Sequence, residues 1–258
     1  VMKNKYLFIT LTIISSLFNS CDVEKKQALD IVDKYVIHFN EPPKNIPSIF
    51  SVDAPLLGNG STGVAIAGNP DSTVFYVARN DFWRLKSGYD EPSPLVLGKV
   101  EINIPELRGA TYSVEQHLSD ATTVAHFTKG DLSFSYKTYI SATEDMMVVE
   151  MNMTGQEAIN VNLELSSISE KELNRKNEIA IECIHLGEIN KSMTGDGIHF
   201  LSRAFSDSVD ISTKAAIAMK SESDNSGKFI LKEGKPQHVI LAFSSNFKSD
   251  DCVKAVVD

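Results

Sequence analysis

The segment with the most chemical character covers residues 74–84, with the sequence VFYVARNDFWR. Its first five residues are apolar or aromatic and predict a β-strand. The remainder reads as a polar and aromatic loop that carries Trp83, the only tryptophan of the chain. Planar aromatic rings stack on the apolar faces of sugars, and Asn80 and Asp81 offer hydrogen bonds to sugar hydroxyls. Asn80, Asp81 and Trp83 are therefore candidates for substrate binding or for a domain interface. Composition alone favours a further alternative, in which Phe82 and Trp83 are core or interdomain packing residues.

A glycine-rich stretch precedes this segment. Gly58, Gly60 and Gly63 match the spacing G-x-G-x-x-G, which in dinucleotide sites follows a strand and opens a helix that holds a pyrophosphate. Here residues 64–68, VAIAG, continue as a strand, so the context does not fit a nucleotide. We interpret Gly58, Asn59, Gly60 and Gly63 as a structural turn, and we expect no cofactor.

Other catalytic patterns are missing from the sequence. The six histidines form neither His-x-His nor His-Glu-x-x-His, so no metal site is expected. A Gly-x-Ser-x-Gly elbow is also missing, which argues against a serine hydrolase of that type. Glycoside hydrolysis needs two facing carboxyl groups, and a single sequence does not show which carboxylates face each other. We therefore assign no catalytic residue.

The amino-terminal residues have the features of an export signal. Lys3 and Lys5 form a basic start, residues 6–18 are almost wholly apolar or hydroxylic, and Ser20 precedes Cys21. The apolar run is short for a bilayer span and typical of a secretory signal. A cysteine directly after a small residue resembles a bacterial lipoprotein signal, in which the Cys21 thiol would be acylated. We expect residues 1–20 to be removed and the mature protein to be an outer-membrane or cell-surface lipoprotein of a bacterium.

Charge and cysteine content narrow the partners further. The formal net charge is −9, and loss of the two leader lysines makes it more negative. An acidic surface does not attract the negatively charged phosphates of nucleic acid, so nucleic acid is not an expected partner. An acidic surface does not attract anionic lipid headgroups either, so the lipid on Cys21 is the only expected membrane attachment. Beyond Cys21, the chain has only Cys183 and Cys252, which form no pattern of a disulfide scaffold or zinc site.

The order of apolar and polar residues predicts the domain organisation. Residues 21–48 are charged and proline-containing, and read as a tether. Residues 49–248 alternate between apolar and polar with a period of two and are divided by glycine-containing turns, which predicts an all-β, mostly antiparallel fold. Such a length is typical of one large two-sheet sandwich. The clearest alternating runs cover residues 96–104, 134–140, 159–165, 209–215 and 239–243.

A short helix is expected at the end of the chain, in residues 249–258. Ser249, Asp250 and Asp251 resemble a helix start, and the valines that follow lie at helical spacing. A helix of this length is marginal without a packing partner. It either docks on the sandwich or, as we expect, begins a linker into a further domain.

Two of these features together resemble a known enzyme group. Residues 55–60, PLLGNG, and 80–83, NDFW, resemble the glycine turn and tryptophan loop in the amino-terminal domain of bacterial glycoside hydrolases related to families 65 and 95. Residues 97–102, LGKVEI, resemble a subgroup of exported proteins with a similar domain. The resemblance covers about residues 50–250, and the sequence departs from the family pattern at Leu57, Ser61, Thr62, Asp81 and Phe82.

The resemblance implies a large sandwich of the six-hairpin-glycosidase type, followed by an (α/α)6 barrel that carries the catalytic acid and base. It places Asn80, Asp81 and Trp83 near the glycan substrate or at the interface with that barrel. The chain is then the non-catalytic sandwich domain of an exported glycoside hydrolase, truncated before its barrel, with a glycan and the barrel as partners. The alternative is a stand-alone glycan-binding surface lipoprotein.

Overall fold

The computed structural model describes residues 31–47, 52–87, 94–173, 185–223 and 226–258. The predicted signal peptide of residues 1–20, Cys21 and the first part of the predicted tether lie outside the described residues. Among the described residues, no helix is long and apolar enough to cross a membrane.

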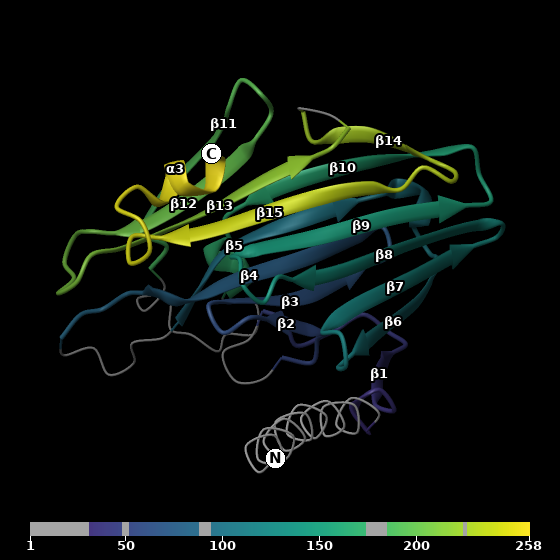
Figure 1. The fold of residues 1–258 in the computed structure, drawn as a ribbon, viewed down its shortest axis with the longest axis horizontal. Coiled ribbons are helices and arrows are strands. Elements are labelled where there is room, and N and C mark those ends of the chain that lie inside the picture. The colour runs from purple at the N-terminus through teal and green to yellow at the C-terminus, as the bar shows by residue number, and fades with distance from the viewer. Residues whose placement is uncertain (1–30, 48–51, 88–93, 174–184, 224–225) are drawn as a thin grey trace, which may run out of the picture.

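Two antiparallel sheets form the body of the described chain (Figure 1). The larger sheet has nine strands, in the spatial order β1 (Val36–Phe39), β6 (Thr111–His117), β7 (Thr122–Lys129), β8 (Leu132–Ile140), β9 (Met146–Thr154), β15 (Gln237–Ser245), β13 (Thr213–Ser221), β12 (His199–Phe205) and β11 (Glu188–Met193). The smaller sheet has six strands, in the order β14 (Lys228–Lys232), β10 (Ala158–Ser166), β5 (Pro94–Asn103), β4 (Ser72–Trp83), β3 (Thr62–Asn69) and β2 (Leu56–Gly58). The predicted all-β sandwich is confirmed.

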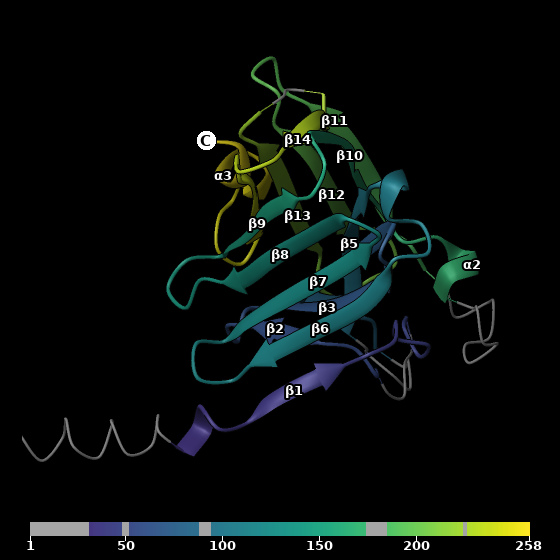
Figure 2. The ribbon, with the colours of Figure 1, turned by 90° about the vertical axis from the view of Figure 1, so that its right-hand side faces the viewer.

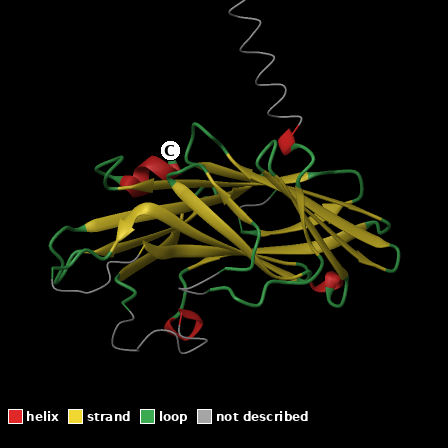
Figure 3. Cartoon of the chain, turned by 90° about the horizontal axis from the view of Figure 1, so that it is seen from below, coloured by secondary structure: helices red, strands yellow, loops and turns green. Residues whose placement is uncertain are grey.

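The sandwich is held together by the alternating apolar residues on the two inner faces. Phe75 of β4, in the smaller sheet, meets Tyr136 of β8, in the larger sheet, edge to face with 5.8 Å between ring centroids. Both side chains are buried, as are Phe127 and Phe134 beside Tyr136. Figure 3 shows the strands in two layers with the short helices outside them. One continuous core between the layers therefore fixes the sheets relative to each other.

Two regions differ from the sequence prediction. Four of the residues assigned to the tether, Val36–Phe39, form β1 and pair with β6 at the edge of the larger sheet. The alternating run 209–215 lies mostly outside the strands, since β13 begins only at Thr213. The amide of Asp210 donates instead to the carbonyl oxygen of Leu85, just after β4, and the alternation of residue types does not record such a long-range contact.

Three short helices lie wholly within the described residues: the 3-10 helix η1 (Pro105–Leu107), α2 (Glu170–Leu173) and α3 (Cys252–Val257). Figure 2 shows α2 and α3 on opposite sides of the molecule. The Asp251 side chain caps α3 by accepting a hydrogen bond from the amide of Lys254. Cys252 and Val256 of α3 pack on Ala216 and Ala218 of β13, so this short helix is stabilised by the outer face of the larger sheet.

Candidate functional site

The segment that carries Trp83 is a strand, not the predicted loop. β4 continues from Ser72 to Trp83, and Arg79 follows Phe75 and Val77 on the buried face. The pairing with β5 shifts register between Ala78 and Trp83. Within this stretch the alternation of burial also changes, so that Phe82 is buried and Trp83 is half-buried. The polar residues of this stretch predict a loop. A strand forms instead, because the buried Arg79 side chain pairs with Asp81 and Asp145.

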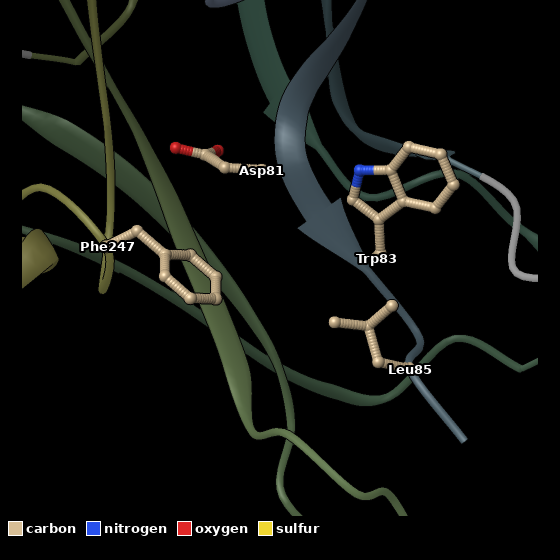
Figure 4. A pocket seen from close by; sticks show the side chains of 4 residues that line it. All are labelled: Asp81, Trp83, Leu85 and Phe247. Atoms are coloured by element: carbon tan, nitrogen blue, oxygen red, sulfur yellow. The ribbon is translucent and has the colours of Figure 1, made fainter. Parts of the chain in front are cut away.

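Asp81 and Trp83 line an open pocket together with Leu85 and Phe247, with a volume of about 400 Å³. Figure 4 shows the Trp83 and Phe247 rings on opposite sides of it. The Trp83 Nε1–H donates to the carbonyl oxygen of Asn80 at 2.5 Å, which fixes the indole relative to its own strand. Phe247 is 56% exposed, which is high for a large aromatic side chain. We refer to this site as the Trp83 pocket.

The Asn80 side chain does not line the Trp83 pocket, although the backbone carbonyl oxygen of Asn80 binds Trp83. The Asn80 side-chain amide donates to the carbonyl oxygen of Gly60 at 2.6 Å, and it lines a second depression of about 340 Å³ beside the glycine-rich turn. Of the three predicted binding residues, the structure therefore brings together Asp81 and Trp83, and directs the Asn80 side chain to the turn.

The glycine-rich turn connects the antiparallel strands β2 and β3, and Gly58 pairs directly with Gly63. Gly60 has φ +87°, a conformation that favours glycine. The Asn59 side-chain oxygen accepts hydrogen bonds from the amides of Ser61 and Thr62 at 3.0 and 2.9 Å. Its amide group donates to the carbonyl oxygens of Ser141 (3.0 Å) and Glu144 (3.3 Å), between β8 and β9. Asn59 therefore links this turn to the opposite sheet.

Behind the Trp83 pocket lies a cluster of four charged residues, which we call the Arg79 cluster: Arg79, Asp81, Asp145 and Lys248. Arg79 binds the Asp81 carboxylate through Nε and Nη2, both at 2.9 Å, and its Nη1 lies 3.2 Å from Asp145 Oδ2. Lys248 Nζ lies 2.5 Å from the same Asp145 oxygen. The Arg79 side chain is 0% exposed, so this cluster compensates a fully buried cation with two carboxylates.

The charges of the cluster stabilise one another. Burial by itself raises the pKa of Asp81, but hydrogen bonds from Arg79 and Ser245 and the Arg79 charge outweigh it and lower that pKa below its usual value. For Asp145, burial is likewise outweighed by Lys248 and Arg79, and its pKa is lowered. Desolvation opposes the charge of Arg79, but the two carboxylates raise its pKa on balance. Asp81, Asp145 and Arg79 are therefore charged at neutral pH.

Sequence reasoning missed Arg79, Asp145, Phe247 and Lys248. The alternation of Phe75, Val77 and Arg79 on one strand face was a usable signal for Arg79. For the other three residues, the sequence has no comparable signal, because they reach the site from distant connections: Asp145 lies between β8 and β9, and Phe247 and Lys248 lie between β15 and α3. Within the described parts of the chain, no cluster of three or more His, Cys, Asp or Glu side chains is placed to hold a metal ion.

Comparisons with known proteins add little to this geometry. No family model matches the sequence, and no curated protein does. Among solved structures, the fold is similar to a chain described provisionally as a kojibiose phosphorylase from human microbiome, with 8% sequence identity and a TM-score of 0.40. The match covers 85% of this chain and 34% of that protein, so this chain spans about a third of its length. A likeness this distant carries no argument about function.

Proposed function

We propose that this chain is a non-catalytic β-sandwich module of an exported protein that acts on glycans, and that the Trp83 pocket contacts a sugar. The observation that carries the proposal is the pocket itself. Two aromatic side chains, Trp83 and Phe247, lie on opposite sides of an open depression that the Asp81 side chain also lines. Apolar walls with a single polar group are a common design for small-ligand sites.

The chemistry of the pocket suits a pyranose ring. The C–H groups on one face of a sugar can lie against the indole of Trp83, and hydroxyls at the ring edge can reach a carboxylate oxygen of Asp81. Because Trp83 already donates its N–H to Asn80, its contribution to a ligand would be the ring face rather than a hydrogen bond.

The state of the carboxylates supports a binding role rather than a catalytic one. The general acid of a glycoside hydrolase needs a raised pKa so that it carries a proton near neutral pH. Asp81 and Asp145 have lowered pKa values because their charges are matched by Arg79 and, for Asp145, by Lys248. We therefore propose that hydrolysis, if the full-length protein performs it, belongs to another domain such as the (α/α)6 barrel.

Replacing Trp83 with alanine is expected to weaken sugar binding at least about tenfold while the domain stays folded, because the stacking surface is lost. Isothermal titration with neutral oligosaccharides of defined linkage measures the affinity, and circular dichroism checks the fold. Tyr139→Ala is the matched control, since Tyr139 is an exposed aromatic side chain on β8 outside the pocket. The proposal fails if no sugar of the panel binds, or if both variants lose affinity equally. Unfolding of Trp83→Ala would instead make Trp83 a packing residue.

The export part of the proposal rests on residues 3–21. Expressed in a bacterium with radioactive palmitate, the full chain is expected to become labelled, and Cys21→Ala is expected to lose the label because it removes the acylated thiol. Cys252→Ala is the control, because Cys252 is buried where α3 packs on β13. Label retained in Cys21→Ala would contradict lipidation at that residue. An immunoblot of source-cell membranes then compares the native size with the 28.4 kDa of this chain and tests for a further domain.

A further inference from the structure

The two aromatic walls of the Trp83 pocket belong to different parts of the sandwich. Trp83 ends β4 in the six-stranded sheet, and Leu85 follows it. Phe247 comes from the connection between β15, in the nine-stranded sheet, and α3. The width of the pocket therefore depends on whatever ties the end of β4 to this connection (Figure 4).

Phe247 lies in a closed turn whose two flanks are both anchored. Before it, the Ser245 hydroxyl donates to Asp81 Oδ2 at 2.6 Å. After it, Lys248 Nζ donates to Asp145 Oδ2 at 2.5 Å and lies 3.3 Å from the Ser61 hydroxyl. Within the turn, the amide of Lys248 donates to the carbonyl oxygen of Ser245 at 3.0 Å. The anchors on either side of Phe247 are thus the two carboxylates of the Arg79 cluster.

Arg79 joins these two anchors. Its guanidinium holds Asp81 through two parallel hydrogen bonds and also pairs with Asp145. A guanidinium in a bidentate pair has a fixed direction, and burial of the side chain removes its alternative positions. We propose that the Arg79 cluster is a positioning device for the Trp83 pocket: Arg79 is its buried centre, and Lys248 is the clamp that holds Phe247 opposite Trp83.

This inference rests on the proposed function for its ligand, but the device can also be tested without one. Trp83 is the only tryptophan of the chain, so its fluorescence reports on the pocket alone. Acrylamide is a neutral quencher, and the charge changes in the variants do not attract or repel it. Lys248 is 47% exposed, and its replacement is therefore compatible with a folded domain.

The experiment compares Lys248→Met, Phe247→Ala and the double variant with the wild-type protein. Lys248→Met and Phe247→Ala are each expected to raise the acrylamide quenching of Trp83. Lys248→Met is also expected to weaken sugar binding about two- to fivefold. Because Lys248 acts through Phe247, adding Lys248→Met to Phe247→Ala is expected to change neither quantity further. The matched control is Lys220→Met, a lysine of 48% exposure on β13 that pairs with Asp196. It should leave both quantities unchanged.

The outcomes separate this inference from the proposed function. If Lys248→Met leaves the quenching of Trp83 unchanged, or if its effect adds fully to that of Phe247→Ala, the positioning role is wrong even where sugar binding is observed. If no sugar binds but the quenching effects are non-additive, the positioning device stands and the sugar ligand is wrong. A general structural role of Lys248 would give additive effects.

Discussion

Replacing Arg79 with methionine is expected to lower the free energy of unfolding at neutral pH by about 3–5 kcal/mol, the usual cost of removing one partner from a buried ion pair. Methionine fills a similar volume, but Asp81 loses both of its guanidinium hydrogen bonds. Asp145 loses Arg79 and keeps Lys248 as its cationic partner. The loss of unfolding free energy is therefore mainly the cost of leaving these two carboxylates partly desolvated without their guanidinium partner.

This loss is measured by urea denaturation followed by circular dichroism. Arg108→Met is the control, because Arg108 is 81% exposed and pairs with Asp71 at the surface, so a change of at most about 1 kcal/mol is expected. Arg79→Lys should lie between the two, since an ammonium keeps the charge but not the bidentate geometry. A loss below about 1 kcal/mol in Arg79→Met would show that the cluster contributes little to stability.

The pH dependence of Arg79→Met follows from the direction of the pKa shifts. Asp81 and Asp145 have lower pKa values in the folded protein than the unfolded value of about 3.9. Their contribution to stability is therefore complete above about pH 4 and is lost as the pH falls through the folded pKa values. In the variant, protonation relieves the unpaired Asp81 carboxylate. The difference in stability between the two proteins should therefore narrow below about pH 4.

Replacing Phe82 with alanine is expected to cost about 3–5 kcal/mol of unfolding free energy, as in other deletions of a buried aromatic side chain. Phe82 is fully buried, its ring centroid lies 5.6 Å from that of Phe205, and the buried guanidinium of Arg203 lies 5.4 Å from it. Burial lowers the pKa of Arg203 to about 10, and Arg203 Nε donates to the carbonyl oxygen of Leu186 at 2.9 Å. Phe82→Ala therefore leaves a cavity beside a desolvated cation.

The informative comparison is with Trp83→Ala at the next position of the same strand. Because Trp83 is half-buried at the edge of an open pocket, its removal should cost no more than about 1–2 kcal/mol. Urea denaturation followed by circular dichroism serves both variants, since Trp83→Ala removes the only tryptophan. Equal losses in the two variants would mean that Trp83 is as much a core residue as Phe82, and would remove the main support for a binding role.

The neighbouring pair Phe82 and Trp83 shows how far the sequence could be interpreted. Both are large aromatics in a segment of mixed character, and composition favoured packing for both. The structure confirms burial for Phe82 and places Trp83 at a pocket. The two residues differ in burial because the pairing of β4 with β5 shifts register between Ala78 and Trp83. This shift changes which side chains of β4 point into the core. A single sequence does not show such a shift when polar residues obscure the alternation.

The sequence by itself determined the all-β class, the position of most long strands, the glycine-rich turn and the capped helix at the end of the described chain. These features depend on local properties: a period of two, the backbone freedom of Gly60 and the helical spacing of the valines in α3. The sequence predicts a hydroxyl cap with acids in the first turn, whereas Asp251 is the cap in the structure. Only the tertiary structure brought Asp145 and Lys248 to Arg79, and Phe247 to Trp83. Alternation shows which side chains face inward, but the pairing of distant strands and the stacking of two sheets decide which of them meet.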